Sequence, residues 1–318
     1  MSIDAIIRAL ADPTRLRIMR LLGTMELAVG ELAQVLGQSQ PRVSRHVGIL
    51  CDARLAERRR EGSWVFLRSL TGEDSAPLGL AVNHLLVAAE QEDEVFSEQC
   101  ESDRRKLADI RSAREEGAEA YFARHAEEWD ELRQLHSPDQ QVEESLIEAL
   151  QAAPIGRFLD IGTGTGRMAE LFAPLADHVV ALDKSLDMLR LARAKLQHLP
   201  SGKLELVQGD FAELPFASLS FDTVVLHQVL HFAQSPDGVL AEAARVTVPG
   251  GRIAIIDFSA HDLEELRARH AHARLGFSDS QLRELLTAAG YRAAKPIALE
   301  GGELVVKIWL GTRQESGS

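Results

Sequence analysis

Residues 157–166 read Arg-Phe-Leu-Asp-Ile-Gly-Thr-Gly-Thr-Gly, and this stretch decides the fold of the C-terminal half of the chain. Its first five residues predict a buried strand, and a helix is expected to begin directly after it at Arg167. Glycines at alternate positions let the backbone turn sharply and approach a ligand closely, because no Cβ intervenes. The next predicted strand, 179–182, ends at Asp183, which follows Asp160 by 23 residues. A doubly wound α/β sheet places an acidic residue near this position, where it holds ribose hydroxyls.

The rest of the C-terminal half continues to alternate between strand and helix signals. Further strands are predicted at 204–208, at 220–226, from 248–252 to near Asp257, at 296–299 and at 304–309. Ser278 and Gln281 form the start of a capped helix that ends at Gly290. Strands that alternate with helices are typical of a mostly parallel sheet covered on both faces. We therefore expect an α/β Rossmann-like fold with a seven-stranded sheet.

The sequence of the glycine loop distinguishes between two classes of nucleotide-binding site. Nicotinamide dinucleotide sites carry G-x-G-x-x-G, whereas this loop is G-x-G-x-G and follows Asp160. With the later segments, Gly-Asp-Phe at 209–211 among them, the pattern resembles the class I S-adenosylmethionine (SAM)-dependent methyltransferases. The resemblance covers residues 155–312 and is nearest to the UbiE-like group of small-molecule methyltransferases. It implies SAM as the cofactor, S-adenosylhomocysteine (SAH) as product or effector, and a small molecule as the methyl acceptor.

This resemblance also implies roles for individual residues. In the family, the residue matching Asp160 lies near the methionine end of the cofactor, the one matching Asp183 holds the ribose, and the one matching Met188 packs by the adenine. The matching glycines shape the loop, an Asp-Phe pair reads the adenine, and the residue matching His227 lines the cleft. The full expected cofactor set is Tyr121, Asp160, Gly162, Thr163, Gly164, Gly166, Asp183, Lys184, Met188, Gly209, Asp210, Phe211 and His227.

Methyl transfer to a poor nucleophile needs a general base, and histidine is the usual choice near neutral pH. The histidines of this half that could act as a base are His227, His231, His261, His270 and His272. The catalytic candidates on the acceptor side are His227, His231 and His261. His227 and His231 are four residues apart after the fourth strand, which allows them to share one face of the following turn. A pocket formed by these histidines with Asp257 would favour a catalytic role. No metal site is expected, since no acidic residue stands at a metal-ligand spacing from the histidines.

Two other methyl acceptors are disfavoured by the residues at their expected motif positions. Enzymes that methylate arsenite resemble this fold but require several cysteines, and Cys51 and Cys100 both lie before the methyltransferase-like region. Enzymes that methylate amino groups of DNA bases carry Asn/Asp-Pro-Pro-Tyr/Phe after the fourth strand, where residues 226–230 read Leu-His-Gln-Val-Leu. The two cysteines favour a reducing, cytoplasmic location. No apolar run reaches the roughly 20 residues that a membrane span requires, so no membrane partner is expected.

The N-terminal segment differs from the rest of the chain in charge. Residues 1–70 hold 11 Arg, no Lys and 7 acidic residues, a net charge of +4, and the remaining 248 residues carry −17, which together give −13. A cationic segment permits binding to the phosphates of DNA, and an acidic body discourages such binding elsewhere.

Three helices and a hairpin are predicted in this cationic segment. The helices are expected to begin at Asp12-Pro13, to cover 29–36 up to Gly37, and to run from a cap at Ser39 to about Leu50. Strands are expected at 55–59 and 64–67, joined through Glu61-Gly62. The third helix has one apolar face, so its other face and the hairpin arginines can bond phosphates and base edges. The full DNA-binding set is Ser39, Gln40, Arg42, Ser44, Arg45, His46, Arg58, Arg59 and Arg60.

Residues 5–70 resemble the ArsR-type winged-helix regulators, with matching blocks at 11–18, 31–33 and 39–46. The resemblance implies a homodimer that binds a palindromic operator in double-stranded DNA. The metal-sensing branch of that family carries two cysteines ahead of the second helix, where this chain has Ala28 and Gly30. Soft-metal sensing needs thiolate ligands, so we expect no metal at this place.

The segment between the two resemblances is acidic and predicted to be mostly helical. Its apolar side favours a dimerisation role, in keeping with the ArsR resemblance. Tyr121-Phe122 and Trp129-Asp130 stand out in this polar region; in small-molecule methyltransferases a helix with this appearance lies over the cofactor cleft. We therefore expect a multidomain chain. Its parts are a winged helix-turn-helix at 1–72, a helical connector and dimerisation segment at 73–135, and a SAM-dependent methyltransferase domain at 136–315.

Two functions fit this organisation. In the first, the protein methylates a small molecule and its DNA-binding domain controls its own operon. In the second, it is a non-catalytic regulator whose methyltransferase fold only senses SAM or SAH. The glycine loop and Asp183 support cofactor binding under both. We favour a combined protein, a regulator that also transfers a methyl group to a small molecule.

Overall fold

A computed structural model describes residues 2–61, 64–71, 76–126, 129, 139–200, 202–299 and 304–315. The chain forms two compact units, Met1–Glu116 and Gly117–Ser318. The predicted turns at Glu61-Gly62 and Gly301-Gly302, and Asp130 of the aromatic motif, include residues outside the described ranges.

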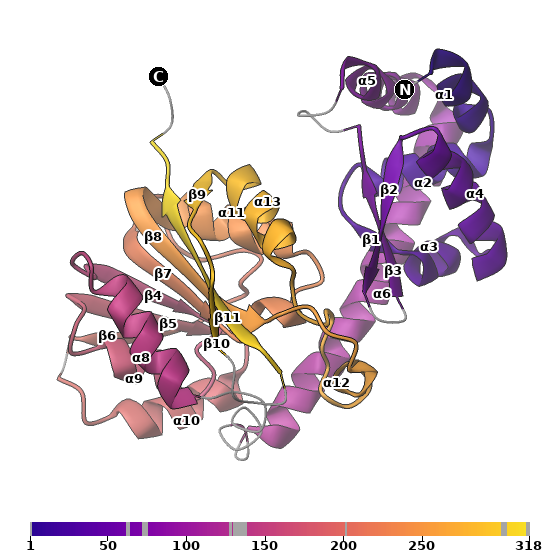
Figure 1. Ribbon diagram of the computed structural model, residues 1–318. Helices are drawn as coiled ribbons and strands as arrows, with labels where there is room; N and C mark the ends of the chain where they lie inside the picture. Colours follow the sequence, from indigo (N-terminus) through magenta and orange to yellow (C-terminus); the bar gives the residue numbers. More distant parts are fainter. Residues whose placement is uncertain are drawn as a thin grey trace. The chain divides into compact units, whose positions relative to one another are not determined.

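The first unit is a small helical domain with a three-stranded antiparallel sheet (Figure 1). Its elements are α1 (Ile3–Leu10), α2 (Pro13–Leu22), β1 (Leu27–Ala28), α3 (Val29–Leu36), α4 (Gln40–Asp52), β2 (Ala56–Glu61), β3 (Trp64–Ser69), α5 (Pro77–Glu92) and most of α6 (Glu94–His125). The strands lie in the order β1-β3-β2. Three helices followed by a hairpin confirm the predicted winged helix-turn-helix.

Local signals set the ends of these helices. The carboxylate of Asp12 accepts from the backbone N–H groups of Thr14 and Arg15, as predicted for an N-cap, and Gly37 adopts φ 62° after α3. The cap predicted for the Ser39 hydroxyl is wrong, because that side chain makes no cap hydrogen bond. A cap bonds the N–H of the second or third helical residue, and Pro41 at the second position has none.

An ion pair ties α2 to α6 within the first unit. Asp103 is 1% exposed, and its carboxylate accepts from Nε and Nη2 of Arg17, each at 2.6 Å. Gln99 donates a third hydrogen bond to the same carboxylate at 3.2 Å. A buried carboxylate is tolerated only when such donors surround it.

Replacing Arg17 by methionine should destabilise this unit by about 2–3 kcal/mol, because it leaves the buried charge of Asp103 without its main partner. Peptide-resolved hydrogen–deuterium exchange on the full chain measures the change at α2 and α6. The matched control is Arg8→Met, which removes an exposed pair with Asp4 and should change stability by less than about 0.5 kcal/mol. Equal effects of the two changes would contradict the argument.

The second unit is an α/β domain with helices on both faces of a mostly parallel sheet (Figure 1). Its strands are β4 (Arg157–Ile161), β5 (His178–Asp183), β6 (Leu204–Gln208), β7 (Phe221–His227), β8 (Thr247–Phe258), β9 (Tyr291–Ala293), β10 (Ile297–Leu299) and β11 (Val306–Arg313). Its described helices are α8 (Asp139–Leu150), α9 (Arg167–Phe172), α10 (Leu186–Leu196), η1 (Leu230–Phe232), α11 (Pro236–Val246), α12 (Glu264–Arg269) and α13 (Asp279–Ala288).

Seven strands form one continuous path in the order β10-β11-β8-β7-β4-β5-β6, and short β9 pairs with the far end of β11. Helices α8, α9 and α10 pack on one face, and α11 and α13 pack on the other. This confirms the predicted Rossmann-like fold. The strand order reverses at β4, which pairs in parallel with both β5 and β7. Ligands of such sheets bind outside the carboxyl ends of the strands at this reversal.

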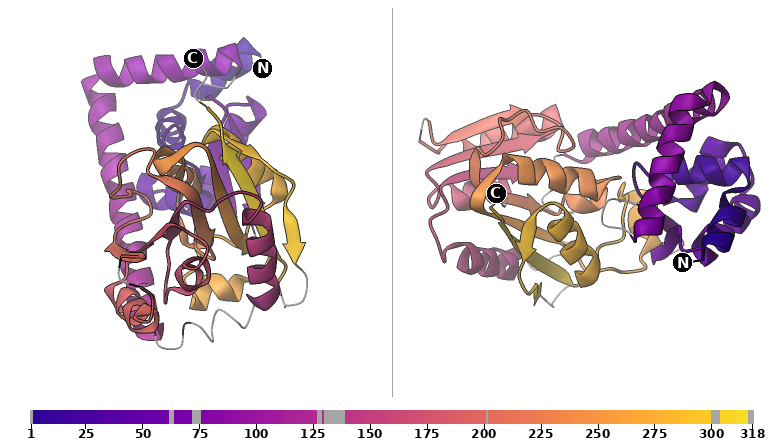
Figure 2. Two further views of the ribbon diagram at one scale, coloured as in Figure 1. Left: turned by 90° about the vertical axis from the view of Figure 1, so that its left-hand side faces the viewer. Right: turned by 90° about the horizontal axis from the view of Figure 1, so that it is seen from above.

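The connecting region contains α5 and the 32-residue helix α6. A single extended residue, Asp93, separates them, and α6 turns sharply away from α5 (Figure 2). Within α5 the predicted apolar side divides, because Leu86 is 3% exposed whereas Leu85 is 60% exposed. Among the described residues, no helix is both long enough and apolar enough to cross a membrane.

Candidate functional site

The glycine loop connects β4 to α9 and is held in place by its own backbone. The N–H groups of Gly162 and Thr163 donate to the carbonyl of Leu182 at 2.8 and 2.9 Å. Gly162 has φ 70°, and a Cβ built there would lie 2.5 Å from Cγ2 of Val229. Gly166 has φ 89°, and a Cβ built there would lie 2.7 Å from Cδ1 of Leu196. Glycine is therefore required at both positions by conformation and by packing.

Asp160 is the penultimate residue of β4 and a buried acid, 1% exposed. Its Oδ2 accepts from the hydroxyl of Thr163 at 2.6 Å, while Oδ1 has no hydrogen-bond partner among the described residues. Burial raises the pKa of Asp160 to about 7, the Thr163 hydrogen bond lowers it, and the charge of Asp183 adds to the rise. A buried carboxylate oxygen without a donor is expensive, and a cationic or hydrogen-bond-donating ligand would satisfy it.

Asp183 ends β5 and faces the loop. Its Oδ2 accepts from the backbone N–H of Gly164 at 2.8 Å, and its Oδ1 accepts from the N–H of Ser185 at 2.9 Å. The Ser185 hydroxyl in turn accepts from the N–H of Met188, which caps α10 and buries the Met188 side chain. The acid that the sequence places on β5 thus contacts the glycine loop directly.

The expected adenine-side residues Asp210 and Phe211 follow β6, and Lys184 follows β5. Lys184 forms an ion pair with Asp210, with 3.2 Å between Nζ and Oδ2. Asp210 also accepts from the N–H of Ala212, which holds the turn after the strand. A Cβ built on Gly209 would approach Cδ1 of Leu182 to 2.9 Å. Phe211 packs against the core cluster on the face of α11 and α13.

The three candidate histidines occupy different environments. His231 is 2% exposed, and its Nδ1 lies 2.8 Å from Oδ1 of Asp257, which is 0% exposed. His261 is half-buried; its Nδ1 accepts from the N–H of Leu263, and burial lowers its pKa to about 4. His227 is buried at the end of β7. We call His231 and Asp257 the dyad.

Aromatic rings fill the space between the glycine loop and the dyad. Phe122, Trp129 and Phe232 contact one another with ring centroids 4.9–6.2 Å apart, and we call them the aromatic triad. The Nε1 of Trp129 lies 3.4 Å from where a Cβ of Gly164 would stand. At the other end of the triad, the ring centroid of Phe232 lies 4.0 Å from the ring centroid of His231. The aromatic motif expected over the cofactor cleft does contact the glycine loop.

Tyr121 lies beside this triad rather than on the loop. Its hydroxyl is 2.8 Å from Nδ1 of His270, its ring packs on His125, and the side chain is 8% exposed. Burial raises the pKa of Tyr121. These contacts attach the C-terminal end of α6 to the segment that follows α12.

Two residues at this site, Phe232 and Gln228, were not identified from the sequence, and His272 was considered only as one of five possible bases. His272 stacks on His231 at 4.1 Å, and Phe232 joins the triad to the dyad. Gln228 has φ 53°, is 6% exposed, and its amide nitrogen has no hydrogen-bond partner among the described residues. A strained, buried and unsatisfied polar residue is typical of a functional site. Only Phe232, as an aromatic beside a candidate histidine, gave a signal that sequence reasoning could have used.

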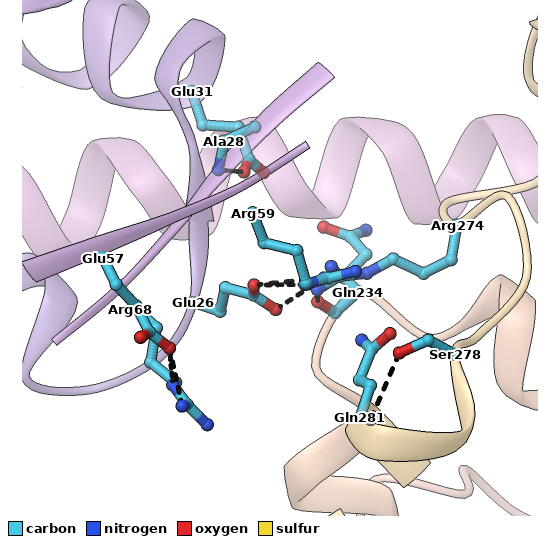
Figure 3. A network of polar contacts seen from close by, with 10 residues as sticks. All are labelled: Glu26, Ala28, Glu31, Glu57, Arg59, Arg68, Gln234, Arg274, Ser278 and Gln281. Carbon is cyan, nitrogen blue, oxygen red and sulfur yellow. Dashed lines mark hydrogen bonds and ion pairs between the residues drawn. The ribbon is translucent and has the colours of Figure 1, made fainter. Parts of the chain in front are cut away.

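The predicted DNA-binding residues fall into two groups. Ser39, just before α4, and Gln40, Arg42, Ser44 and Arg45 on that helix are exposed. His46 on α4 is half-buried, with its Nδ1 3.6 Å from Oδ1 of Asp12. The hairpin arginines are partly engaged within the unit. Arg58 donates to the carbonyl of Ser44 at 3.3 Å, and Arg59 pairs with Glu26 through two nitrogens (Figure 3). Arg60 is exposed. The outer face of α4 is therefore the continuous exposed polar surface of this set.

Comparisons with known proteins identify both parts of the chain. Residues 159–255 match the family model described as "Methyltransferase domain", and residues 12–58 match the one described as "Bacterial regulatory protein, arsR family". The chain is 38% identical over 114 residues to a demethylmenaquinone methyltransferase of Renibacterium salmoninarum, which is 36% of this chain and 46% of that protein. It is 34% identical over 164 residues to an uncharacterized 37.1 kDa protein in transposon TN4556 of Streptomyces fradiae, which is 46% of each.

The chain thus spans about half the length of the curated relatives it matches. Among solved structures, it is similar to a chain from the complex between the Haloferax volcanii Trm112 methyltransferase activator and a methyltransferase. That similarity has a TM-score of 0.53 and 20% identity, and covers 63% of this chain and 99% of the other. It supports the fold alone. Together with the two family matches, the geometry establishes that this chain joins an arsR-family regulatory domain to a methyltransferase domain.

Proposed function

We propose that this protein is a DNA-binding regulator whose C-terminal domain binds SAM and transfers its methyl group to a small molecule. The observation that carries the proposal is the loop of Gly162, Gly164 and Gly166 held by Asp183, beside the buried Asp160. The proposal keeps the division into a winged helix at 1–72, a connector at 73–135 and a methyltransferase domain at 136–315.

The residues present fit the chemistry of SAM. Asp183 has a carboxylate at the end of β5 for the ribose hydroxyls, and Met188 is buried beside it. The free oxygen of Asp160 suits the positively charged methionine end of SAM. When bound, SAM supplies an electrophilic methyl group; the protein aligns an acceptor with it and excludes water.

Calorimetry on the full chain tests cofactor binding, with SAM and SAH as separate titrants. Transfer of a labelled methyl group from SAM into a small-molecule extract tests catalysis. Binding of both ligands without any transfer would favour the second candidate, a regulator that only senses SAM or SAH. Failure of both ligands to bind would overturn the proposal for the C-terminal domain.

The affinity for SAM should rise with pH up to about 7 and level off above it. Below that value Asp160 is protonated in the free protein, since burial raises its pKa to about 7. The positive charge of SAM favours the ionised carboxylate, so binding releases a proton, and the affinity gains at most tenfold per pH unit. SAH lacks the sulfonium charge and should depend less on pH. Calorimetry between pH 5.5 and 8.5 measures both slopes; Asp160→Asn should flatten the slope for SAM.

The proposal includes a homodimer on a palindromic operator. Its support is a set of exposed apolar side chains on the helices of the first unit: Ile3, Ile7, Leu85 and Val95, each at least 57% exposed. Ile3 and Ile7 are four residues apart on α1 and share one face of that helix, and adjacent exposed apolar side chains are typical of an interaction surface.

Replacing Leu85 by glutamate should weaken the dimer at least tenfold, because a charge would be buried at the interface. Sedimentation velocity over a dilution series measures the dissociation constant. Leu186→Glu is the matched control, since Leu186 on α10 is also 60% exposed but lies in the other unit. A dimer that tolerates Leu85→Glu as well as Leu186→Glu would place the interface elsewhere.

One observation favours SAM or SAH as an effector of DNA binding. Helix α6 contributes Asp103 to the first unit, where it pairs with Arg17 on α2, and Tyr121 and Phe122 to the second. Phe122 contacts Trp129, which lies against the glycine loop. Fluorescence anisotropy with the protein's own upstream DNA tests this at fixed salt. Coupled sites typically change each other's affinity at least about fivefold; unchanged DNA affinity with ligand bound would exclude the effector role.

A further inference from the structure

The ring of His46 lies between α4 and the N-cap of α2. The exposed side chains of α4 face solvent, whereas the side chain of His46 is 14% exposed. Its Nδ1 is buried and has no hydrogen-bond partner among the described residues. Oδ1 of Asp12 lies 3.6 Å from this nitrogen, beyond a hydrogen bond but within the distance of an ion pair. A buried nitrogen without a partner costs free energy, and pairing with Asp12 would remove that cost.

Asp12 presents an ionised carboxylate to this ring. Its Oδ1 caps α2 by accepting from the N–H groups of Thr14 and Arg15, and its Oδ2 lies 3.8 Å from Nη1 of Arg15. Burial acts to raise the pKa of Asp12, but these N–H groups and the charges of Arg15 and His46 bring it below its ordinary value. The carboxylate is therefore charged throughout the pH range in which histidine titrates.

Charged groups on the elements packed against α4 also bear on the ring. These elements are α1, α2, α3 and β2. Their acidic side chains other than Asp12, among those that the structure describes, are engaged elsewhere: Asp4 with Arg8, Glu31 with the N–H of Ala28, and Glu57 with Arg68. The cations Arg15 of α2, Arg58 of β2, and Arg42 and Arg45 of α4 itself oppose a charge on the ring. Asp12 is thus the group in this set that favours a protonated His46.

A second contact joins the same parts of the domain. The amide nitrogen of Gln38, in the turn before α4, lies 3.4 Å from the hydroxyl of Thr14 in the first turn of α2. This distance is long for a hydrogen bond, so the contact constrains α4 only weakly. A charged bond between His46 and Asp12 would hold the same end of α4, which carries Arg42, on the first turn of α2.

We propose that His46 is a positioning residue for DNA recognition, whose protonated ring pairs with Asp12 and fixes α4 on α2, so that DNA binding takes up a proton. This inference rests on the proposed DNA binding and deepens it with a dependence on pH. The neutral ring donates through Nδ1 in one of its two tautomers, whereas the protonated ring always donates and adds a positive charge. A movement of less than about 1 Å closes the gap to a charge-assisted hydrogen bond.

The pair contributes only while His46 is protonated and Asp12 is ionised. Histidine ordinarily titrates at about pH 6.5, so the contribution is present at pH 6 and is lost as the pH rises to 8. If DNA selects the paired form, its affinity rises as the pH falls, by at most about tenfold per pH unit for each subunit. The exposed fraction of Asp12 keeps the expected effect well below that limit.

Fluorescence anisotropy at fixed ionic strength, with a duplex from the protein's own upstream region, tests this linkage. The wild type should bind at least about threefold more tightly at pH 6 than at pH 8. Asp12→Asn removes the charge and keeps the cap, since asparagine caps helices as well as aspartate. His46→Asn keeps an N–H near the place of Nδ1. Both variants should lose the pH dependence and should bind within about twofold of the wild type at pH 8, where the pair is absent.

The matched control is His198→Asn, at an exposed histidine of the second unit, which should keep the full pH dependence. His84, the other histidine of residues 1–116, is exposed and present in every variant, so it cannot cause a difference between them. A wild-type affinity that is equal at pH 6 and pH 8 overturns the inference. Loss of the pH dependence in His46→Asn but not in Asp12→Asn would mean that the charged ring contacts DNA phosphates directly, which overturns the pairing with Asp12. An equal loss of affinity at both pH values would mean a purely structural contact.

A second experiment does not need DNA. Peptide-resolved hydrogen–deuterium exchange on the full chain, corrected for the intrinsic exchange rate at each pH, measures the protection of α4 and of the first turn of α2. This protection should rise at least about twofold from pH 8 to pH 6 in the wild type and in neither variant. If no duplex binds but the rise is present, the proposed DNA binding fails while the pair stands. If the duplex binds and the protection does not change with pH, this inference fails alone.

Discussion

Replacing Asp183 by alanine should lower the affinity for SAM about 1,000-fold. The carboxylate fixes the loop through the N–H of Gly164 and the start of α10 through the N–H of Ser185. In the proposed complex it also binds the ribose hydroxyls. Hydrogen bonds to a charged group contribute about 1.5–3 kcal/mol each, so losing the ribose contacts and the loop support together gives an effect of this size. Calorimetry with SAM measures it.

The control for this prediction is Asp187→Ala on the same helix. Asp187 pairs with the exposed Arg190 at 2.9 Å and forms no hydrogen bond or ion pair with the described residues of the loop. Its removal should change the SAM affinity less than twofold. DNA binding in the absence of cofactor should remain in both variants. An Asp183→Ala protein that is folded, binds DNA and still binds SAM with nearly full affinity would show that the site lies elsewhere.

The double variant Arg42→Ala, Arg45→Ala should weaken operator binding about 1,000-fold. Both arginines are exposed on the outer face of α4, the helix expected to enter the major groove. A dimer loses four such side chains, and each base or phosphate contact contributes about 1–3 kcal/mol. Fluorescence anisotropy at several salt concentrations measures the loss. The slope of the logarithm of the DNA affinity against the logarithm of the salt concentration should also become shallower with each phosphate contact removed.

Arg190→Ala, Arg193→Ala is a control of equal charge change, since both arginines lie on α10 in the acidic second unit. It should leave operator binding within about twofold. The same loss in both double variants would mean that total charge, and not the face of α4, determines the affinity.

The sequence predicted elements whose signals are local. The strand before the glycine loop, the helix 29–36 and the strand 204–208 were predicted at or close to their observed bounds, because apolar pattern, Gly37 and the loop glycines set their ends. Two short strands were not predicted. β1 has two residues and β9 has three, and both exist because they pair with β3 and β11. Pairing with a distant strand leaves almost no mark in so short a segment.

The candidate site likewise has one part that local sequence signals locate and one part that depends on distant pairing. The loop and Asp183 could be located because a fixed spacing joins them in the chain. The sequence grouped His231 and Asp257 in one expected pocket, but it could not single out their hydrogen bond, because 26 residues separate them and the parallel pairing of β7 with β8 brings them together. The sequence offered three histidines of equal standing, and burial distinguishes them. His231 has a carboxylate partner, whereas Nδ1 of His261 accepts from the N–H of Leu263.

The hydrogen bonds within the glycine loop have a consequence for the thermodynamics of ligand binding. The backbone N–H groups of Gly162, Thr163 and Gly164 are bonded within the chain, to Leu182 and Asp183 of β5. A loop that is ordered beforehand loses little conformational entropy when a ligand arrives. Association at this end of the cleft should then be fast and nearly rigid.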